Sequence, residues 1–110
     1  MKIRLRNIEN WDELADQAKW SVARLAKQCG VSPRTIERYF LEHKRKSPKV
    51  WLNEKRQQNA VELLRKGYSV KETADRLRYR WESTFSREFT KYWGFSPVRA
   101  KDADVAAAFE

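Results

Sequence analysis

Residues 79–97, which run Y-R-W-E-S-T-F-S-R-E-F-T-K-Y-W-G-F-S-P, decide the fold of this chain. Phe85 and Phe89 stand about one helical turn apart, so they belong to one face of a helix. Gly94 is suited to end that helix, because glycine adopts a positive φ without steric cost. Ser96-Pro97 begins a further helix, since serine caps a helix and proline fits its first position.

The same pattern occurs earlier in the chain and makes it a repeat. Moving the sequence along itself by 49 positions pairs Thr35, Ile36, Arg38, Phe40 and Ser47-Pro48 with Thr84, Phe85, Arg87, Phe89 and Ser96-Pro97. Moving it by 48 positions pairs Ser21, Val22, Ala26, Cys29 and Val31 with Ser69, Val70, Ala74, Leu77 and Tyr79. The difference of one position indicates an extra residue in the second turn. Each copy is a helix-turn-helix unit.

The turn of the first unit has the expected residue types. A small residue, Ala26, allows the two helices to cross closely, Gly30 makes the turn, and apolar residues such as Ile36 hold the second helix. The second unit has Arg78 in place of the glycine, which is unfavourable if a positive φ is needed. The second turn is therefore the one that we expect to differ.

Helix start signals cover the rest of the chain, at Asn10 with Glu13, Ser21, Ser32-Pro33, Ser47-Pro48 and Ser69 with Glu72. We predict an all-α fold of about seven helices, with two tandem homeodomain-like helix-turn-helix subdomains joined by a long central helix. The predicted segments are a basic N-terminal arm or linker remnant at 1–10, the first subdomain at 11–47, the linker helix at 48–66, the second subdomain at 67–102, and a fraying tail at 103–110.

Charge and composition indicate an acidic partner. Lys and Arg number 24 against 15 Asp and Glu, which gives a net charge of +9. Basic side chains that displace counterions from phosphates gain free energy, so nucleic acid is the commonest such partner. Cys29 and His43 are the only cysteine and histidine, which excludes an intrachain disulfide and a zinc finger. We expect no enzyme activity, no cofactor and no metal, because no catalytic constellation is recognisable.

The chain has no stretch near the roughly 20 apolar residues that span a bilayer, and its first residues lack the apolar run of a signal peptide. We therefore expect a cytoplasmic protein without a membrane partner.

The predicted second helix of each unit, at about 33–45 and 81–92, has an outer face with arginine. A helical wheel puts Arg34 and Arg38 opposite an inner face of Ile36, Tyr39, Phe40 and His43. In the second unit the inner face has Trp81, Phe85, Phe89 and Tyr92, and the outer face has Ser83, Arg87 and Thr90. An arginine fork matches the O6 and N7 acceptors of guanine. Arg34, Arg38 and Arg87 are therefore the predicted base readers.

The helix predicted at residues 48–66 would span about 28 Å at 1.5 Å per residue. Successive major grooves on one face of DNA lie about 34 Å apart, so a bent duplex could accept both reading helices in adjacent grooves. We expect a monomer to bind an asymmetric site of about 20 bp.

The paired units, the stretch Tyr79–Phe89 and the sequence Gly94–Pro97 resemble the AraC/XylS family of bacterial transcription regulators over about residues 11–100. The resemblance implies seven helices, with the third and sixth in adjacent major grooves. It also implies a bacterial cytoplasmic activator that contacts RNA polymerase. Many members carry an effector-binding and dimerising domain for which this chain has no room, so we expect a stand-alone regulator or a fragment that binds no small molecule.

The resemblance also implies site residues. The family's DNA-contacting positions match Arg34, Glu37, Arg38, Glu82, Ser83, Thr84 and Arg87, and Arg56 matches an arginine that recurs in the family's central helix. To the DNA-binding set we add Thr35, and our further candidates for phosphate contact or positioning are Ser32, Arg45, Lys46 and Lys91. Two departures from the family pattern, Arg78 for glycine and Trp81 for a small capping residue, affect the second unit.

Several residues have a second interpretation. Trp81 could stack on a sugar or a thymine methyl, although its spacing with Phe85 favours the core. Glu37 and Glu82 could accept a hydrogen bond from cytosine or orient an arginine. Cys29 and His43 fit structural roles better than chemical ones.

Two other functions are open at this level. The charge alone would suit an architectural or recombinase-associated protein that binds DNA without sequence preference. A helical protein-interaction module or an enzyme is the remaining alternative, motivated only by the number of aromatic residues, and no catalytic constellation supports the enzyme.

Overall fold

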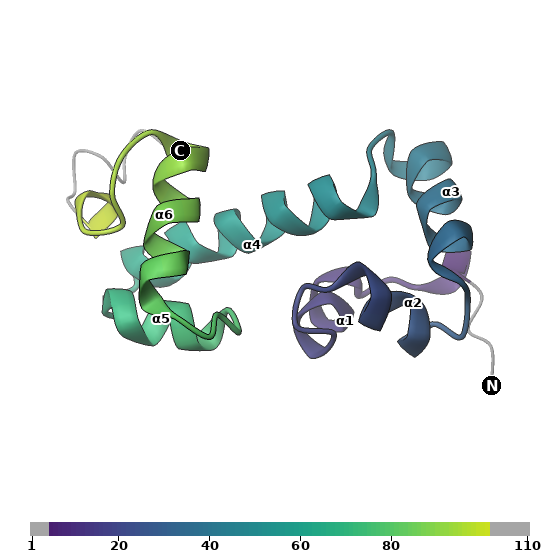
Figure 1. Cartoon of the computed structure of the whole chain (residues 1–110), viewed down its shortest axis with the longest axis horizontal. Helices are drawn as coiled ribbons and strands as arrows, with labels where there is room; N and C mark the ends of the chain where they lie inside the picture. Colours follow the sequence, from purple (N-terminus) through teal and green to yellow (C-terminus); the bar gives the residue numbers. More distant parts are fainter. Residues whose placement is uncertain (1–4, 102–110) are drawn as a thin grey trace. The chain divides into compact units, whose positions relative to one another are not determined.

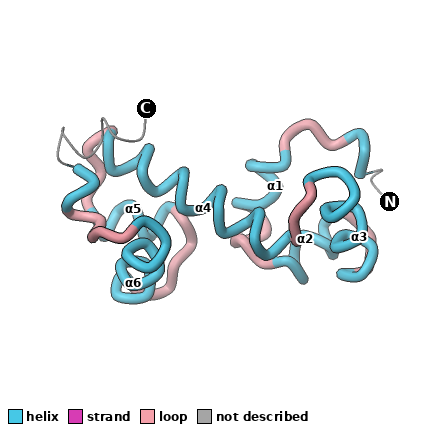
Figure 2. Tube along the Cα trace, turned by 90° about the horizontal axis from the view of Figure 1, so that it is seen from above, coloured by secondary structure: helices cyan, strands magenta, loops and turns pink. Residues whose placement is uncertain are grey.

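The computed structural model describes residues 5–101, and these are all helix or connecting loop, with no strand (Figures 1 and 2). The six α-helices are α1 (Trp11–Gln17), α2 (Val22–Gln28), α3 (Pro33–Lys44), α4 (Pro48–Arg65), α5 (Val70–Arg76) and α6 (Glu82–Trp93). Two 3-10 turns, at Leu5–Asn7 and Arg99–Lys101, flank them. The all-α prediction is confirmed. The seventh helix, expected after Pro97, is the second of these short turns.

The chain divides into two compact units, one up to Lys55 and one from Arg56. Helix α4 supplies its first part to one unit and its remainder to the other. Residues 1–4 of the predicted basic arm and all of the predicted tail, residues 103–110, lie outside the described residues. No helix within residues 5–101 combines the length and the apolar character needed to cross a bilayer.

The first unit is built around an aromatic core. In this unit α2 packs against both α1 and α3. Phe40 of α3 is completely buried, and its ring centroid lies 5.0 Å from that of Trp11 and 5.5 Å from that of Trp51. Leu25 and Ile36 complete the buried layer between α2 and α3. The core therefore fixes α3 by the side that carries Ile36 and Phe40.

The second unit repeats this arrangement with different side chains. Helix α5 packs against α6, and Phe85 and Phe89 of α6 are completely buried. Their ring centroids lie 5.7 Å apart, and Tyr79 lies 5.3 Å from Phe85. As in α3, the two buried positions are four residues apart, so the opposite side of α6 is free of the core.

Side-chain caps explain where most of the helices begin. Side-chain oxygens of Asn10, Ser21, Ser32, Ser47 and Ser69 each accept a hydrogen bond from the backbone N–H three residues later. Ser69 and Glu72 form the reciprocal capping box that the sequence predicts. Helix α6 is the exception, because its N-cap is Trp81, whose side chain cannot cap.

The helix bounds confirm the repeat and its inserted residue. Helices α2 and α5 differ by 48 positions, and α3 and α6 differ by 49. The expected difference between the turns is wrong. Gly30 N–H donates to the Lys27 carbonyl, and Arg78 N–H donates to the equivalent Asp75 carbonyl, both at 3.1 Å. The two turns therefore have the same hydrogen bonds, and the extra residue comes after Arg78.

Candidate nucleic-acid interface

The exposed side of α3 carries the arginines expected to read bases in the first unit. Arg34, Glu37 and Arg38 are exposed, whereas Ile36 and Phe40 on the other side are buried. Within residues 5–101, these three charged side chains form no ion pair with one another or with the core of the first unit. Their guanidinium and carboxylate groups are thus presented outward from a helix that the core holds in place.

Ser32 and Thr35 are occupied at the start of α3. Ser32 Oγ accepts a hydrogen bond from Thr35 N–H at 3.2 Å, and the two hydroxyl oxygens are 2.9 Å apart. Thr35 is half-buried. Both residues therefore shape the first turn of α3, and any contact that they make with DNA would be made from the capped conformation.

Helix α6 presents a second outward side. Glu82, Ser83 and Arg87 are exposed, and so is Lys91 one turn after Arg87. Thr84 is half-buried beside the completely buried Phe85. Arg38 and Arg87 are 49 positions apart, as are α3 and α6, so they occupy the same place in the two helices.

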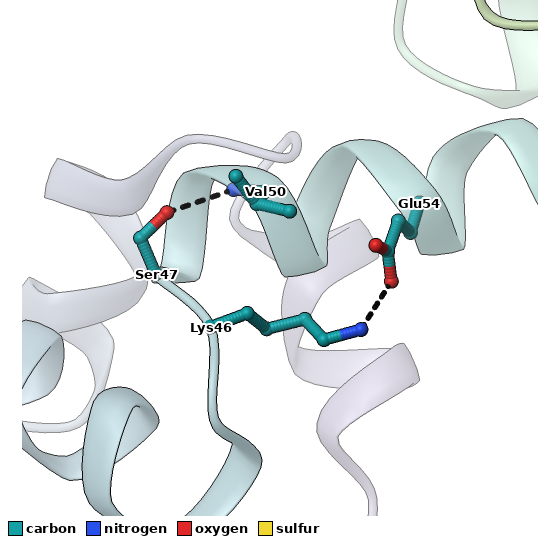
Figure 3. Close-up of polar contacts among 4 residues, drawn as sticks. All are labelled: Lys46, Ser47, Val50 and Glu54. Carbon is teal, nitrogen blue, oxygen red and sulfur yellow. Dashed lines mark hydrogen bonds and ion pairs between the residues drawn. The ribbon is translucent and has the colours of Figure 1, made fainter.

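Two basic residues connect α3 to α4. Arg45 is exposed and has a left-handed backbone, with φ of 59°. Lys46 Nζ forms an ion pair of 2.7 Å with Glu54 of α4, while Ser47 Oγ caps α4 at Val50 (Figure 3). Lys46 is therefore paired within the protein, whereas no ion pair of Arg45 is found among residues 5–101.

Arg56 of α4 is held inside the second unit. Its Nε and Nη2 both donate to the Leu77 carbonyl, at 3.1 and 2.9 Å, and its guanidinium lies 3.5 Å from the centroid of the Tyr79 ring. Burial lowers the pKa of Arg56, an effect that Tyr79 and Glu88 oppose. The Leu77 carbonyl belongs to the C-cap of α5, so Arg56 fixes the turn before α6.

The Tyr79 hydroxyl continues this network and was missed by the sequence analysis. It donates to Glu88 Oε2 at 2.6 Å and accepts from Gln57 Nε2 at 3.2 Å. Burial, followed by the hydrogen bond to Glu88, raises the pKa of Tyr79 far above its ordinary value. The network joins α4, the turn and α6. Only the repeat, which pairs Tyr79 with Val31, marked this position as structural.

Three side chains expected on the inner faces lie at the surface instead. Trp81 is 60% exposed and Tyr92 40% exposed, and His43 is exposed beside Tyr39, at 4.4 Å between ring centroids. The inner faces are narrower than the helical wheels predicted. Cys29 is completely buried, and this burial raises the pKa of its thiol.

A cationic cluster in the first unit was also missed. Lys44 Nζ lies 5.2 Å from the Trp51 ring centroid and 5.6 Å from that of Trp11, and Lys55 Nζ lies 5.7 Å from Trp51 on its own part of α4. Burial lowers the pKa of Lys44, as does the charge of Lys55. Such cation–π contacts stabilise the aromatic core at its rim.

Within residues 5–101, no group of three or more His, Cys, Asp and Glu side chains is arranged to hold a metal ion.

Comparison with known proteins shows a consistent likeness. The sequence model of a family described as "Helix-turn-helix domain" matches residues 25–102. An uncharacterized HTH-type transcriptional regulator of Escherichia coli (strain K12), YidL, is 35% identical over 82 residues, which are 74% of this chain and 28% of that protein. The chain thus spans less than a third of the length of that relative.

Solved structures extend the likeness to the fold. The DNA-binding domain of AdpA, a global transcriptional factor solved in complex with a target DNA, has a TM-score of 0.70 and 28% identity, with 90% of this chain and 96% of that one covered. A DNA-binding transcriptional dual regulator from Escherichia coli K-12 has a TM-score of 0.67 and 26% identity, with 86% and 87% covered. The C-terminal domain of the response regulator yesN from Fusobacterium nucleatum shares the fold, with a TM-score of 0.73 at 18% identity and with 83% and 89% covered.

Proposed function

This chain belongs to the AraC/XylS family of helix-turn-helix DNA-binding transcription regulators, and we propose that it recognises a specific duplex sequence through α3 and α6. The observation that carries this proposal is the equivalence of Arg38 and Arg87. Each is exposed on the side of its helix opposite two completely buried residues, Ile36 and Phe40 in α3 and Phe85 and Phe89 in α6.

The chemistry of these residues suits base recognition in the major groove. A guanidinium donates two parallel hydrogen bonds to guanine, a contact worth about 1–3 kcal/mol of discrimination. Arg34 and Arg38 would read one half-site and Arg87 the other. Ser83 and Thr84 supply hydroxyls that accept or donate, while Glu37 and Glu82 would accept from cytosine or orient a neighbouring arginine.

Backbone contacts would set the position of each helix. Exposed Arg45 and Lys91 suit phosphate contact, because their charge displaces counterions without reading sequence. Ser32 and Thr35 would maintain the capped start of α3 while that helix contacts DNA. For Arg56 we propose a positioning role within the second unit, and for Lys46 a phosphate contact only if it leaves Glu54.

The finer proposal is that α3 and α6 enter adjacent major grooves of one duplex. A single chain would then bind an asymmetric site of about 20 bp with half-sites about one helical turn apart. We propose that the protein acts in the cytoplasm as an activator that contacts RNA polymerase, with 11–47 and 67–102 as reading subdomains and 48–66 as the linker. An effector-binding domain elsewhere in the whole protein would be compatible with this role.

The experiment is selection of binding sites from a random duplex library at about 150 mM salt, near physiological ionic strength. Wild type should select a bipartite motif, and Arg38→Ala and Arg87→Ala should each relax one half of it. Arg24→Ala, which removes an exposed charge of α2, is the control and should weaken binding without relaxing either half.

The alternative, a binder without sequence preference, makes the opposite prediction. No motif would be enriched, all three variants would weaken binding alike, and affinity would fall steeply with salt. That result would reject the proposal.

A further inference from the structure

Trp81 is a large aromatic side chain placed at the start of a proposed reading helix without support from the core. It is 60% exposed, whereas Trp11, Trp20 and Trp51 are buried. An indole in water forgoes the free energy of burying its apolar surface, so an exposed one adjacent to a binding surface indicates a contact with a partner.

The backbone explains why Trp81 is outside the core. Its φ and ψ of −126° and 131° are extended, and it is the N-cap residue, one position before the first helical residue Glu82. The helical spacing with Phe85 therefore does not apply to it. The Trp81 side chain is accordingly exposed, whereas Phe85 and Phe89 are completely buried.

The choice of tryptophan here does not serve the stability of α6. At the equivalent position of the first unit, 49 residues earlier, Ser32 caps α3 through the Thr35 N–H. Trp81 makes no side-chain hydrogen bond to the start of α6. A capping side chain normally stabilises a helix, so this position has given up a favourable local interaction.

We propose that Trp81 reads thymine, by packing its indole ring against the thymine 5-methyl group in the major groove. The methyl group is the one apolar feature that bases present there, and it distinguishes thymine from the other three bases. Trp81 immediately precedes Glu82, Ser83 and Thr84, the first-turn residues proposed to contact the second half-site. This inference rests on the proposed function and adds a specificity determinant to it.

Arg80 supports a position of Trp81 against DNA. Its guanidinium carbon lies 5.2 Å from the centroid of the Trp81 ring, and both side chains are exposed. A cation beside the ring suits a surface that approaches phosphates, because the same approach brings the charge near the backbone and the ring near the bases.

The test combines a protein change with the removal of a single methyl group. In the selected duplex, each thymine of the second half-site is replaced in turn by deoxyuridine, which lacks only the 5-methyl group. Wild type should lose about fourfold in affinity at one of these positions, the change that corresponds to one buried methyl. Trp81→Ser should bind the duplex with deoxyuridine at that position as tightly as it binds the duplex with thymine.

Trp81→Ser is a matched variant because it gives α6 the residue that caps α3. It should melt no lower than wild type, so weakened binding cannot be ascribed to unfolding. As a second readout, acrylamide should quench a component of wild-type fluorescence that Trp81→Ser lacks, and DNA should protect that component.

The two proposals fail in different ways. If no motif is selected, the proposed function fails and this inference with it. If a motif is selected but no deoxyuridine position affects wild type more than Trp81→Ser, or Trp81 remains fully quenchable in the complex, only the assignment of Trp81 is overturned.

Discussion

Gly30 and Arg78 have the same left-handed backbone, with φ of 69° and 67°, at equivalent points of the two helix-turn-helix units. The hydrogen bonds that follow also match, since Val31 N–H donates to the Ala26 carbonyl and Tyr79 N–H to the Ala74 carbonyl, both at 3.0 Å. A left-handed φ favours glycine, because other L-residues meet steric strain there. One fold therefore places a favourable residue in its first turn and a strained one in its second.

Exchanging these residues should change stability in opposite directions. Gly30→Arg should lower the free energy of unfolding by about 1 kcal/mol, since a side chain in the left-handed region costs roughly 1–2 kcal/mol. Arg78→Gly should raise it by a smaller amount, because glycine also loses more backbone entropy on folding. Urea unfolding measures both. A loss of stability in Arg78→Gly would show that contacts of the arginine side chain outweigh the backbone strain.

Arg56 should prove to be a stability residue of the second unit. Arg56→Ala removes two charge-assisted hydrogen bonds to the Leu77 carbonyl, so we expect a loss of about 2–3 kcal/mol in urea unfolding. Arg56→Lys should lose less stability than Arg56→Ala, because its ammonium keeps the charge. It should still be less stable than wild type, because an ammonium does not stack on Tyr79 as a guanidinium does.

DNA binding separates this role from a phosphate contact. Folded Arg56→Ala should keep the selected motif and the salt dependence of wild type. A salt slope reduced by about one, with unfolding unchanged, would instead make Arg56 a phosphate ligand. Arg24→Ala, at an exposed position, is the control for stability and should remain within about 0.5 kcal/mol of wild type.

The sequence predicted what depends on neighbours in the chain. Serine caps and buried pairs such as Phe85 and Phe89 are signals that lie within one or two helical turns. The repeat also allowed the helices predicted for one unit to be compared with those predicted for the other. The helix bounds therefore agreed with expectation to within a few residues. The wheel failed for Trp81 because it was extended to a residue whose backbone is not helical.

Contacts between distant residues could not be predicted in the same way. Arg56 and Tyr79 meet only because the second unit folds α4 onto the turn before α6, and no periodicity in the sequence indicates that pairing. The sequence suggested that Lys46 is available to contact phosphate, because its partner Glu54 is eight residues away and approaches it only once the chain has turned into α4. For the outward faces of α3 and α6, the structure gives exposure, whereas their contacts with DNA stay predictions.

The Tyr79 hydroxyl should make stability depend on pH in the alkaline range. Burial and the hydrogen bond to Glu88 raise the pKa of Tyr79 in the folded protein, while the unfolded chain releases the proton near pH 10. The stabilisation is therefore complete below about pH 10 and is lost as the pH rises above it.

Tyr79→Phe isolates this effect. At pH 7 it should be less stable than wild type by about 1–3 kcal/mol, because Glu88 and Gln57 lose their hydroxyl partner. Above pH 10 the difference should shrink by up to about 1.4 kcal/mol per pH unit. Urea unfolding at several pH values measures the difference, with Tyr92→Phe as a control for losing an exposed hydroxyl. A constant gap from pH 7 to pH 11 would contradict the prediction.

The ion pair between Lys46 and Glu54 should restrain DNA binding more than it stabilises the fold. Both side chains are partly exposed, at 37% and 29%, so Glu54→Gln should alter the free energy of unfolding by no more than about 1 kcal/mol. The substitution releases Lys46 from a carboxylate 2.7 Å away, so its ammonium becomes available to a phosphate.

We therefore expect Glu54→Gln to bind duplex DNA more tightly and with a salt slope steeper by about 0.9, the value for one added phosphate contact. The control is the same substitution combined with Lys46→Ala, in which no ammonium is released and the steeper slope should disappear. If both backgrounds show the same rise in affinity, Glu54 acts through general repulsion of phosphates, and Lys46 makes no contact. A change in slope confined to the background with Lys46 would assign that contact to Lys46, since only its ammonium differs between the two.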